Sequence, residues 1–334
     1  MIKFCILVVA PWYPAGPIKY IAEAFERIGC EVIRIGATYN DHMGLSWGTD
    51  AVVPDRELPR EAPCWDLNEF VDWTTRNYQA PDMLLVSEEN YQTDIRPTKK
   101  IPSVLWSFDG WPNSFARVEL FQPTLAYMNH PYGVKPHPRE AEDPRWRFMP
   151  AACAPWLHKN LRRERSVDFC LLATPYRKRP ELAMGLAEHW LTVRFGQKTS
   201  HEYVLVYNMA LSTYHNCNRQ EEVKFRFFEA AAMGCINISD HTRLFETLGY
   251  KPGQHYILIE DEDLDEDHWP TVDALAETIT DLRALPELAR QIADNAYQHT
   301  VRHHTYFSRC RQIFSDLHLP DMVAEADETI ERKI

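Results

Sequence analysis

Short apolar runs alternate with amphipathic segments along the first part of the chain. Two segments, residues 17–29 and 67–78, repeat their apolar positions with the period of a helix. The apolar runs between them have the length of strands and cover residues 3–9, 30–36, 83–88, 101–108 and 124–130. Because these runs lack polar alternation and are separated by helices, they predict a parallel sheet covered on both faces.

A second set of strands and helices follows residues 130–146, a segment dense in proline and charge that is typical of a linker or a rim loop. The predicted strands are residues 167–174, 210–215, 235–240 and 256–261. The predicted helices are residues 179–195, 224–234, 271–285, 286–301 and 305–317. With 334 residues, the chain is long enough for two such α/β domains, each with its own core.

Bulk composition narrows the class of protein. No stretch approaches the roughly 18 consecutive apolar residues that a membrane helix needs, and the apolar start is interpreted as a strand. Eight cysteines occur without any C-x-x-C pair, which favours buried thiols in a reducing compartment and predicts a cytoplasmic protein. The net charge of −12 argues against general binding of nucleic acid, while a local basic groove stays possible.

Three consecutive cations stand where a strand ends and a helix begins. Arg177, Lys178 and Arg179 follow the run at residues 167–174. Cations beside the free N–H groups of a helix N-terminus suit a diphosphate. A solvated basic turn is the alternative interpretation.

The predicted helix at residues 224–234 is apolar on most sides, yet it carries charge. On a helical wheel Glu222, Arg226 and Glu229 fall within roughly 60° of one another. Burying either charge without a partner is costly. The charges therefore indicate an internal ion pair, a solvated stripe or a binding site.

Two further candidates lie just past predicted strand ends in the first half. Asp109 and His130 are suited to proton transfer or to orienting a hydroxyl. A turn and a loop cap are the alternatives. Near the other end, His299 and His303 are one helical turn apart, which is compatible with metal chelation as well as with a plain helix junction.

The stretch RFFEAAAMGCINISD, followed by YILIED and a later H-T-Y-x-x-R pattern, resembles the C-terminal half of group 1 glycosyltransferases of the GT-B fold. The likeness is greatest to the branch whose signature is R-x-F-E-x-x-A-x-G, and it spans residues 167–314. The resemblance implies two Rossmann-like parallel-sheet domains that face each other across a cleft. It assigns acceptor binding to residues 1–150, nucleotide-sugar binding to residues 151–305, and a helix returning to the first domain to residues 306–334.

The resemblance also implies roles for the candidate residues. Glu229 would hold the nucleotide ribose, and the cations from Arg177 to Arg179 would hold the diphosphate. Gly234 would let the backbone approach the donor. Glu221 would contact the sugar, because it stands in the E-x7-E spacing with Glu229, and Arg226 is the alternative donor contact.

On the N-terminal side, the resemblance implies that His130 touches the transferred sugar and that an acidic residue such as Asp109 orients the acceptor hydroxyl. Enzymes of this fold generally need no metal, and no D-x-D motif stands at a strand end here. The resemblance therefore implies neither a metal nor another cofactor.

These observations predict a glycosyltransferase that moves a hexose or a pentose from a nucleotide-sugar donor, with UDP as the first choice, and that retains anomeric configuration. One alternative is a sugar-nucleotide epimerase of the same fold. Another is a binding protein without turnover, favoured by the lack of a glycine-rich loop between Glu221 and Glu229. The acceptor stays open among a glycan, a small molecule and a modified DNA base. The first 150 residues carry 15 basic and 20 acidic side chains, which weakens the DNA hypothesis.

Overall fold

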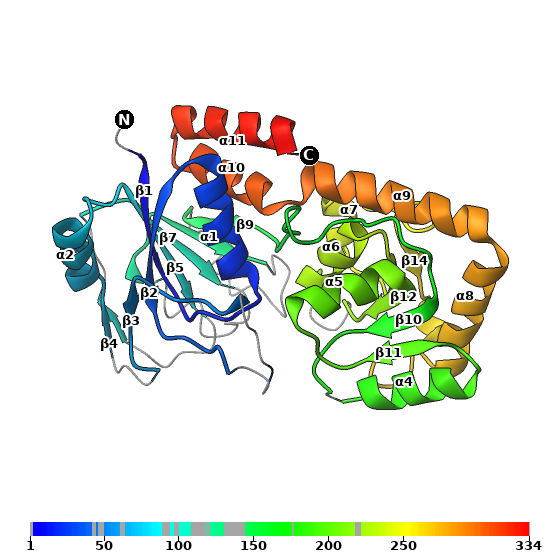
Figure 1. Cartoon of the computed structure of the whole chain (residues 1–334). Coiled ribbons are helices and arrows are strands. Elements are labelled where there is room, and N and C mark those ends of the chain that lie inside the picture. The colour runs from blue at the N-terminus through cyan, green and yellow to red at the C-terminus, as the bar shows by residue number, and fades with distance from the viewer. Residues whose placement is uncertain are drawn as a thin grey trace. The chain divides into compact units, whose positions relative to one another are not determined.

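The computed structural model describes residues 3–41, 45, 50–60, 64–88, 94–96, 100–107, 118, 121–129, 144–175, 177–217 and 222–333. The chain divides into two compact units. Unit 1 consists of residues 1–150 and 306–333, and unit 2 of residues 151–305 (Figure 1). Each unit is built around a parallel sheet, which confirms the predicted α/β class.

The sheet of unit 1 has seven strands in the order β3-β2-β1-β5-β7-β8-β9, and every neighbouring pair is parallel. The strands are β1 Cys5–Val9, β2 Glu31–Gly36, β3 Arg56–Glu57, β5 Met83–Glu88, β7 Ser103–Ser107, β8 Leu125–Met128 and β9 Trp146–Phe148. A separate pair consists of β4 Cys64–Asp66 and β6 Asp94–Arg96. Residues 130–143 of the expected linker lie outside the described residues.

Burial explains why the central strands are apolar throughout. All residues of β1 are fully buried, so neither face of this strand tolerates a polar side chain. At the end of β2, Gly36 has φ 152°, and a Cβ there would lie 1.7 Å from the carbonyl oxygen of Ala10. The close approach of these two backbones therefore requires glycine.

Helices cover the sheet of unit 1. The helices are α1 Pro17–Ile28, α2 Leu67–Asn77, α10 Tyr306–Asp316 and α11 Pro320–Lys333. Phe70 and Val71 of α2 join the core formed by Leu7, Ile33 and Leu84. Thus α2 seals one face of the sheet.

The two C-terminal helices pack in unit 1 although they follow unit 2 in the sequence. The rings of Phe25 on α1 and Phe314 on α10 lie 5.4 Å apart. Tyr127 on β8 donates a hydrogen bond to the Asp316 carboxylate at 2.7 Å. Buried aromatic and polar contacts thereby attach α10 to both α1 and the sheet.

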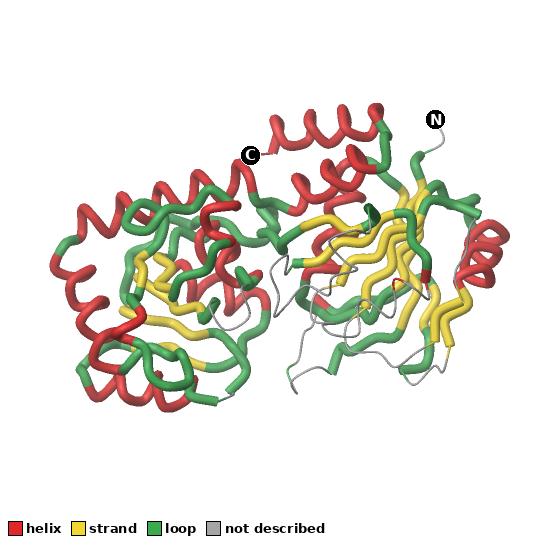
Figure 2. Tube along the Cα trace, turned by 180° about the vertical axis from the view of Figure 1, so that it is seen from behind, coloured by secondary structure: helices red, strands yellow, loops and turns green. Residues whose placement is uncertain are grey.

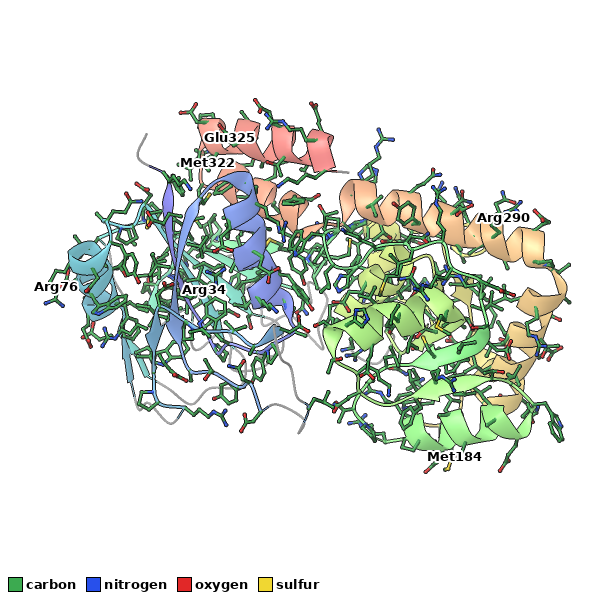
Figure 3. The ribbon with its side chains drawn as sticks, in the orientation of Figure 1. Arg34, Arg76, Met184, Arg290, Met322 and Glu325 are labelled. Carbon is green, nitrogen blue, oxygen red and sulfur yellow. The ribbon has the colours of Figure 1, made fainter. Side chains whose placement is uncertain are left out.

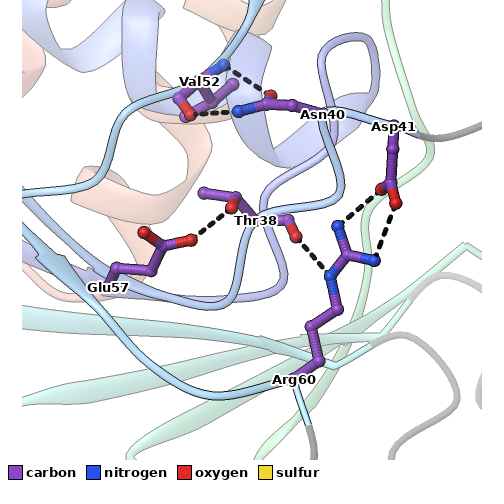
Figure 4. A network of polar contacts seen from close by, with 6 residues as sticks. All are labelled: Thr38, Asn40, Asp41, Val52, Glu57 and Arg60. Carbon is purple, nitrogen blue, oxygen red and sulfur yellow. Dashed lines mark hydrogen bonds and ion pairs between the residues drawn. The ribbon is translucent and has the colours of Figure 1, made fainter.

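The loop that follows β2 is held by side chains (Figure 4). The Asn40 carboxamide bonds both the N–H and the carbonyl of Val52, at 2.9 and 2.8 Å. Two guanidinium nitrogens of Arg60 donate hydrogen bonds to the two oxygens of the Asp41 carboxylate. The Nε atom of Arg60 also donates to the Thr38 carbonyl at 2.8 Å. This network fixes the backbone at the carboxyl end of the strand, the edge at which parallel sheets bind ligands.

Unit 2 contains a five-stranded parallel sheet in the order β11-β10-β12-β13-β14. Its strands are β10 Val167–Leu171, β11 Val193–Phe195, β12 Ala210–His215, β13 Ile236–Ser239 and β14 Ile257–Leu258. Its helices are α4 Arg179–Glu188, α5 Ser200–Met209, α6 Phe225–Ala232, α7 Leu244–Thr247, α8 Val272–Ala284 and α9 Pro286–His303, with a 3₁₀ turn η4 at Asp261–Asp263.

Helices lie on both faces of this sheet (Figure 2). Side chains of α4, α8 and α9 form one core with Phe169 and Leu171 of β10. Side chains of α5 and α6 form a second core with Cys170. On the outer side, Met184 of α4 and Arg290 of α9 point away from the sheet (Figure 3).

One expectation about unit 2 is wrong, and one helix was missed. The predicted helix at residues 179–195 ends at Glu188, and the chain then enters β11 at Val193. The helix α5 was not predicted, because its sequence, SHEYVLVYNM, is rich in strand-favouring residues. Packing against the sheet overrides that propensity.

Within the described residues, no helix is both long and apolar enough to cross a membrane.

Candidate functional site

A cavity of about 250 Å³ opens at the carboxyl edge of the sheet of unit 2. Its floor is made by the ends of β10 and β12, and its walls by the N-terminal regions of α4 and α6 together with Trp269. Parallel strands end together at this edge, which is where open α/β sheets bind ligands. The lining residues are Leu171, Ala173, Arg177, Arg179, Tyr214, His215, Asn216, Lys224, Arg226 and Trp269.

Among the described residues that line the cavity, four side chains are cations and none is an acid. Arg177 and Arg179 come from the start of α4, and Lys224 and Arg226 from the start of α6. Lys224 is partly neutralised by an ion pair with the buried Glu222 carboxylate. The cavity is therefore positively charged and presents mainly hydrogen-bond donors.

Both helices also direct their N-termini to this region. Neither the N-cap Lys178 of α4 nor the N-cap Lys224 of α6 makes a side-chain capping bond. The first N–H groups and the positive dipole ends add to the side-chain cations. Arg177 adopts φ 54°, a left-handed conformation that is strained for a residue with a side chain and that recurs at binding sites.

Lys178 lies between Arg177 and Arg179 in the sequence but does not line the cavity. Its ammonium group pairs with Asp265 at 2.7 Å and Asp267 at 3.0 Å. These partners raise the pKa of Lys178 above its usual range. This lysine therefore ties α4 to the acidic loop after η4, a different role from the expected diphosphate contact.

Sequence reasoning placed only Arg177, Arg179 and Arg226 of the lining residues at a binding site, and among the residues it missed are Tyr214 and His215. His215 is buried, and its Nε2 lies 2.9 Å from the Asn237 Oδ1 atom. Burial, with Arg226 and Arg179 nearby, lowers the pKa of His215 to about 3, so the ring is neutral at physiological pH. Both residues end the apolar run at residues 210–215. The rule that ligands bind at carboxyl strand ends is the signal that points to them.

The Glu229 carboxylate is 2% exposed and has protein partners instead of lining the cavity. Tyr203 on α5 donates a hydrogen bond to it, and the His158 Nε2 atom lies 3.5 Å from its other oxygen. Burial raises the pKa of Glu229 to about 7, although Tyr203 and Arg226 act in the opposite direction. The structure thus gives this carboxylate partners other than the expected ribose.

Gly234 lies at the opposite edge of the sheet, just before β13. It has φ 70°, and a Cβ there would lie 2.6 Å from the Asn160 amide nitrogen and 2.8 Å from an Arg165 nitrogen. The glycine thus ends α6 and makes room for these side chains. It does not provide the close approach to a donor at the carboxyl edge that the resemblance implied.

Other expected residues occupy different positions. Glu222 precedes α6, which begins at Phe225, so it does not share a helical face with Arg226 and Glu229 as predicted. Asp109, His130 and Glu221 lie outside the described residues.

The histidines near the end of α9 make structural contacts. The Nε2 atoms of His299 and His304 lie 2.8 and 2.9 Å from the Leu248 carbonyl oxygen. Among residues that the structure describes, no group of three or more His, Cys, Asp and Glu side chains is arranged to hold a metal ion.

Comparison with known families agrees with this geometry. Residues 152–315, which include nearly all of unit 2 and most of α10, match the model of a family described as glycosyl transferase-like. Comparison with curated protein sequences finds no match.

Solved structures resemble the chain over almost its whole length. HepE from Anabaena, in a structure with UDP and glucose, has a TM-score of 0.61 at 15% identity, covering 94% of this chain and 99% of HepE. Sucrose-phosphate synthase from Thermosynechococcus elongatus has a TM-score of 0.54 at 11% identity, with coverage of 94% and 99%. A DNA-modifying β-glucosyltransferase has a TM-score of 0.50 at 11% identity, with coverage of 97% and 99%.

At these identities the solved structures establish the fold, and the family match adds the class. The chain is a glycosyltransferase of the GT-B fold. Its segment from residue 152 to residue 315 is the glycosyl transferase-like part.

Proposed function

We propose that the protein transfers a sugar from a UDP-linked donor, with unit 2 binding the donor and unit 1 binding the acceptor. The observation that carries this proposal is the cavity with Arg177, Arg179, Lys224 and Arg226 at the carboxyl edge of the sheet. A nucleoside diphosphate has the complementary charge. UDP is chosen because the structure of the similar HepE contains UDP and glucose.

The same cations explain how transfer would be accelerated. When the bond between the sugar and the diphosphate breaks, negative charge develops on the leaving group. Arginine and lysine side chains and two helix N-termini at the cavity would stabilise that charge. We therefore propose transfer without a metal ion, and retention of configuration as the sequence resemblance implies.

The acceptor is proposed only as a class. A hydroxyl of a glycan, of a small molecule or of a modified DNA base fits the reaction. We also propose that the protein acts in the cytoplasm. Seven cysteines in the described part of the chain are free and buried, as expected in a reducing compartment.

UDP is expected to stabilise the folded protein. At about 100 times Kd, a ligand that binds only the folded state adds about 2.7 kcal/mol to the free energy of unfolding. For a unit of this size that corresponds to a rise of roughly 5 to 10 °C in Tm. Arg226→Met should weaken UDP binding by about tenfold or more, because it removes a charge-assisted bond. Thermal melts and calorimetric titration measure both effects.

Arg194→Met is the matched control, because Arg194 is an exposed arginine on β11 that does not line the cavity. It should leave UDP affinity within about twofold of the original protein, as for an exposed side chain without a ligand contact. If UDP leaves Tm unchanged in the original protein, the donor site is assigned to the wrong nucleotide or the wrong cavity.

Turnover distinguishes a transferase from a binding protein. We expect slow release of UDP when the protein is incubated with UDP-sugars and water as the acceptor, and faster release when a suitable acceptor is added. EDTA should not change the rate if the cations replace a metal. A protein that binds UDP-sugars tightly but releases no UDP with any candidate acceptor would contradict the proposed activity.

A further inference from the structure

The cavity of unit 2 contains one ring nitrogen whose protonation state follows from its neighbours. The Asn237 amide nitrogen donates a hydrogen bond to the Phe227 carbonyl at 3.0 Å, which fixes the orientation of the carboxamide. The Asn237 Oδ1 atom is then the group that faces the His215 Nε2 atom at 2.9 Å. Because Oδ1 can only accept, the Nε2 atom of His215 carries the proton.

A neutral imidazole protonated at Nε2 has a lone pair at Nδ1. Within the part of the chain that the structure describes, the hydrogen bond of the His215 ring is the one to Asn237. The Phe227 ring lies edge to face with the imidazole at 5.7 Å. Asn237 and Phe227 thus hold the ring in one position, and its Nδ1 atom is left as an acceptor on a residue that lines the cavity.

This acceptor stands among donors. The side chains of Arg179 and Arg226 are close enough to disfavour a positive charge on His215. These arginines would bind anionic oxygens of the ligand. An anionic oxygen has no proton to donate, so it cannot form a hydrogen bond with the lone pair of the His215 Nδ1 atom. The group beside Nδ1 must therefore bring its own proton.

We propose that the Nδ1 atom of His215 accepts a hydrogen bond from a hydroxyl of the nucleotide-sugar donor, and so selects a hydroxylated ligand over a bare diphosphate. The hydroxyl belongs either to the ribose or to the transferred sugar. This inference rests on the proposed donor site. His215 binds the donor directly, and Asn237 is a positioning residue that fixes the tautomer.

The test compares three ligand classes on His215→Phe, which keeps an aromatic ring but removes the acceptor. Inorganic pyrophosphate has no hydroxyl of this kind, UDP has the ribose, and UDP-glucose, UDP-galactose and UDP-N-acetylglucosamine have both. We expect unchanged affinity for pyrophosphate and a three- to tenfold loss where the bonded hydroxyl is present, the range of one neutral hydrogen bond. His201→Gln, at an exposed histidine on α5, should change none of these affinities.

Each pattern of affinities has one meaning. A loss for UDP and the UDP-sugars together assigns the ribose, and a loss for the UDP-sugars alone assigns the transferred sugar. Equal affinities of His215→Phe and the original protein for all three classes would overturn the inference while leaving the proposed function intact. If the original protein binds none of them, the proposed function fails first.

A spectroscopic measurement on the unsubstituted protein does not depend on the folding of a variant. In long-range ¹H–¹⁵N spectra of protein labelled at histidine, we expect the Nδ1 resonance of His215 in the unprotonated range at pH 5 to 8. Addition of the preferred nucleotide should move it in the direction of a hydrogen-bonded nitrogen. A protonated Nδ1, or a resonance that the nucleotide does not move, would exclude the acceptor role.

Discussion

Replacing Arg165 by methionine is expected to lower the free energy of unfolding of unit 2 by about 3 to 5 kcal/mol, the cost of removing a half-buried charged donor from its acceptors. The guanidinium donates to the carbonyls of Tyr207, Asn208 and Ala210 at 2.8 to 3.0 Å. It also donates to the carbonyls of Met233 and Gly234 at 3.2 and 2.5 Å. These carbonyls follow or end the helices α5 and α6.

The arrangement is electrostatically favourable because the carbonyl ends of two helices surround one cation. The C-terminus of a helix carries partial negative charge, and its last carbonyls lack intrahelical partners. No carboxylate takes part in these bonds, and burial lowers the pKa of the Arg165 guanidinium. Methionine would leave several carbonyls without donors. Scanning calorimetry should show the loss as a Tm lower by about 10 °C.

Two variants separate the causes. Arg165→Lys keeps the charge but has no planar fork, so it should lose an intermediate amount of stability. Arg163→Met, at an exposed neighbour, should change stability by no more than about 0.5 kcal/mol. If Arg165→Met melts with the original protein, the carbonyl cluster does not depend on this arginine.

The second large effect is expected at Glu229 and depends on pH. Burial raises the pKa of this carboxyl from 4.5 to about 7 in the folded protein. Between these two values the folded state binds more protons than the unfolded state. The contribution of Glu229 to stability is therefore fully present below pH 4.5 and is lost as pH rises toward 7. A shift of this size corresponds to about 3 kcal/mol at pH 8.

Glu229→Gln removes this titration while keeping the shape of the side chain. We expect the variant to unfold at nearly the same denaturant concentration as the original protein at pH 5. At pH 8 it should be more stable by about 2 to 3 kcal/mol, because no ionised carboxylate is buried. Chemical denaturation across this pH range measures the difference. Tyr203→Phe, which removes the hydrogen bond to the carboxylate, should increase the pH dependence instead.

The same variant tests the ribose role that the sequence resemblance assigned to Glu229. Since the carboxylate is bonded to Tyr203 and near His158, Glu229→Gln should alter UDP affinity by less than threefold, the effect of an indirect contact. A tenfold loss of UDP affinity without the change in pH dependence would return the ribose role to this residue.

The α/β architecture could be predicted from sequence because its signals are local. Fully buried strands such as β1 and β7 leave unbroken apolar runs, and helices such as α1 and α9 leave a 3.6-residue period. Strand ends are equally local. For this reason the sequence placed Arg177, Arg179 and Arg226 near a ligand edge, and the three line one cavity.

Elements with weak local signals were missed. The strand β11 has only three residues, and α5 is composed of residues that favour strands. Their structures depend on the neighbouring strand β10 and on the cores of the two faces. A short stretch of the sequence does not include those neighbouring elements, so its local pattern does not predict β11 or α5.

The sequence by itself determined the class of fold and the cation-rich edge of the sheet of unit 2. Both follow from the spacing of apolar residues and from charges that lie close together in the sequence. The tertiary structure decided which of the charged residues face the cavity. Lys178 turns to Asp265, and Glu229 turns to Tyr203, a residue 26 positions away. The acceptor atom of His215 likewise depends on Asn237 and Phe227. Such roles follow from contacts between distant parts of the chain, and only folding brings those parts together.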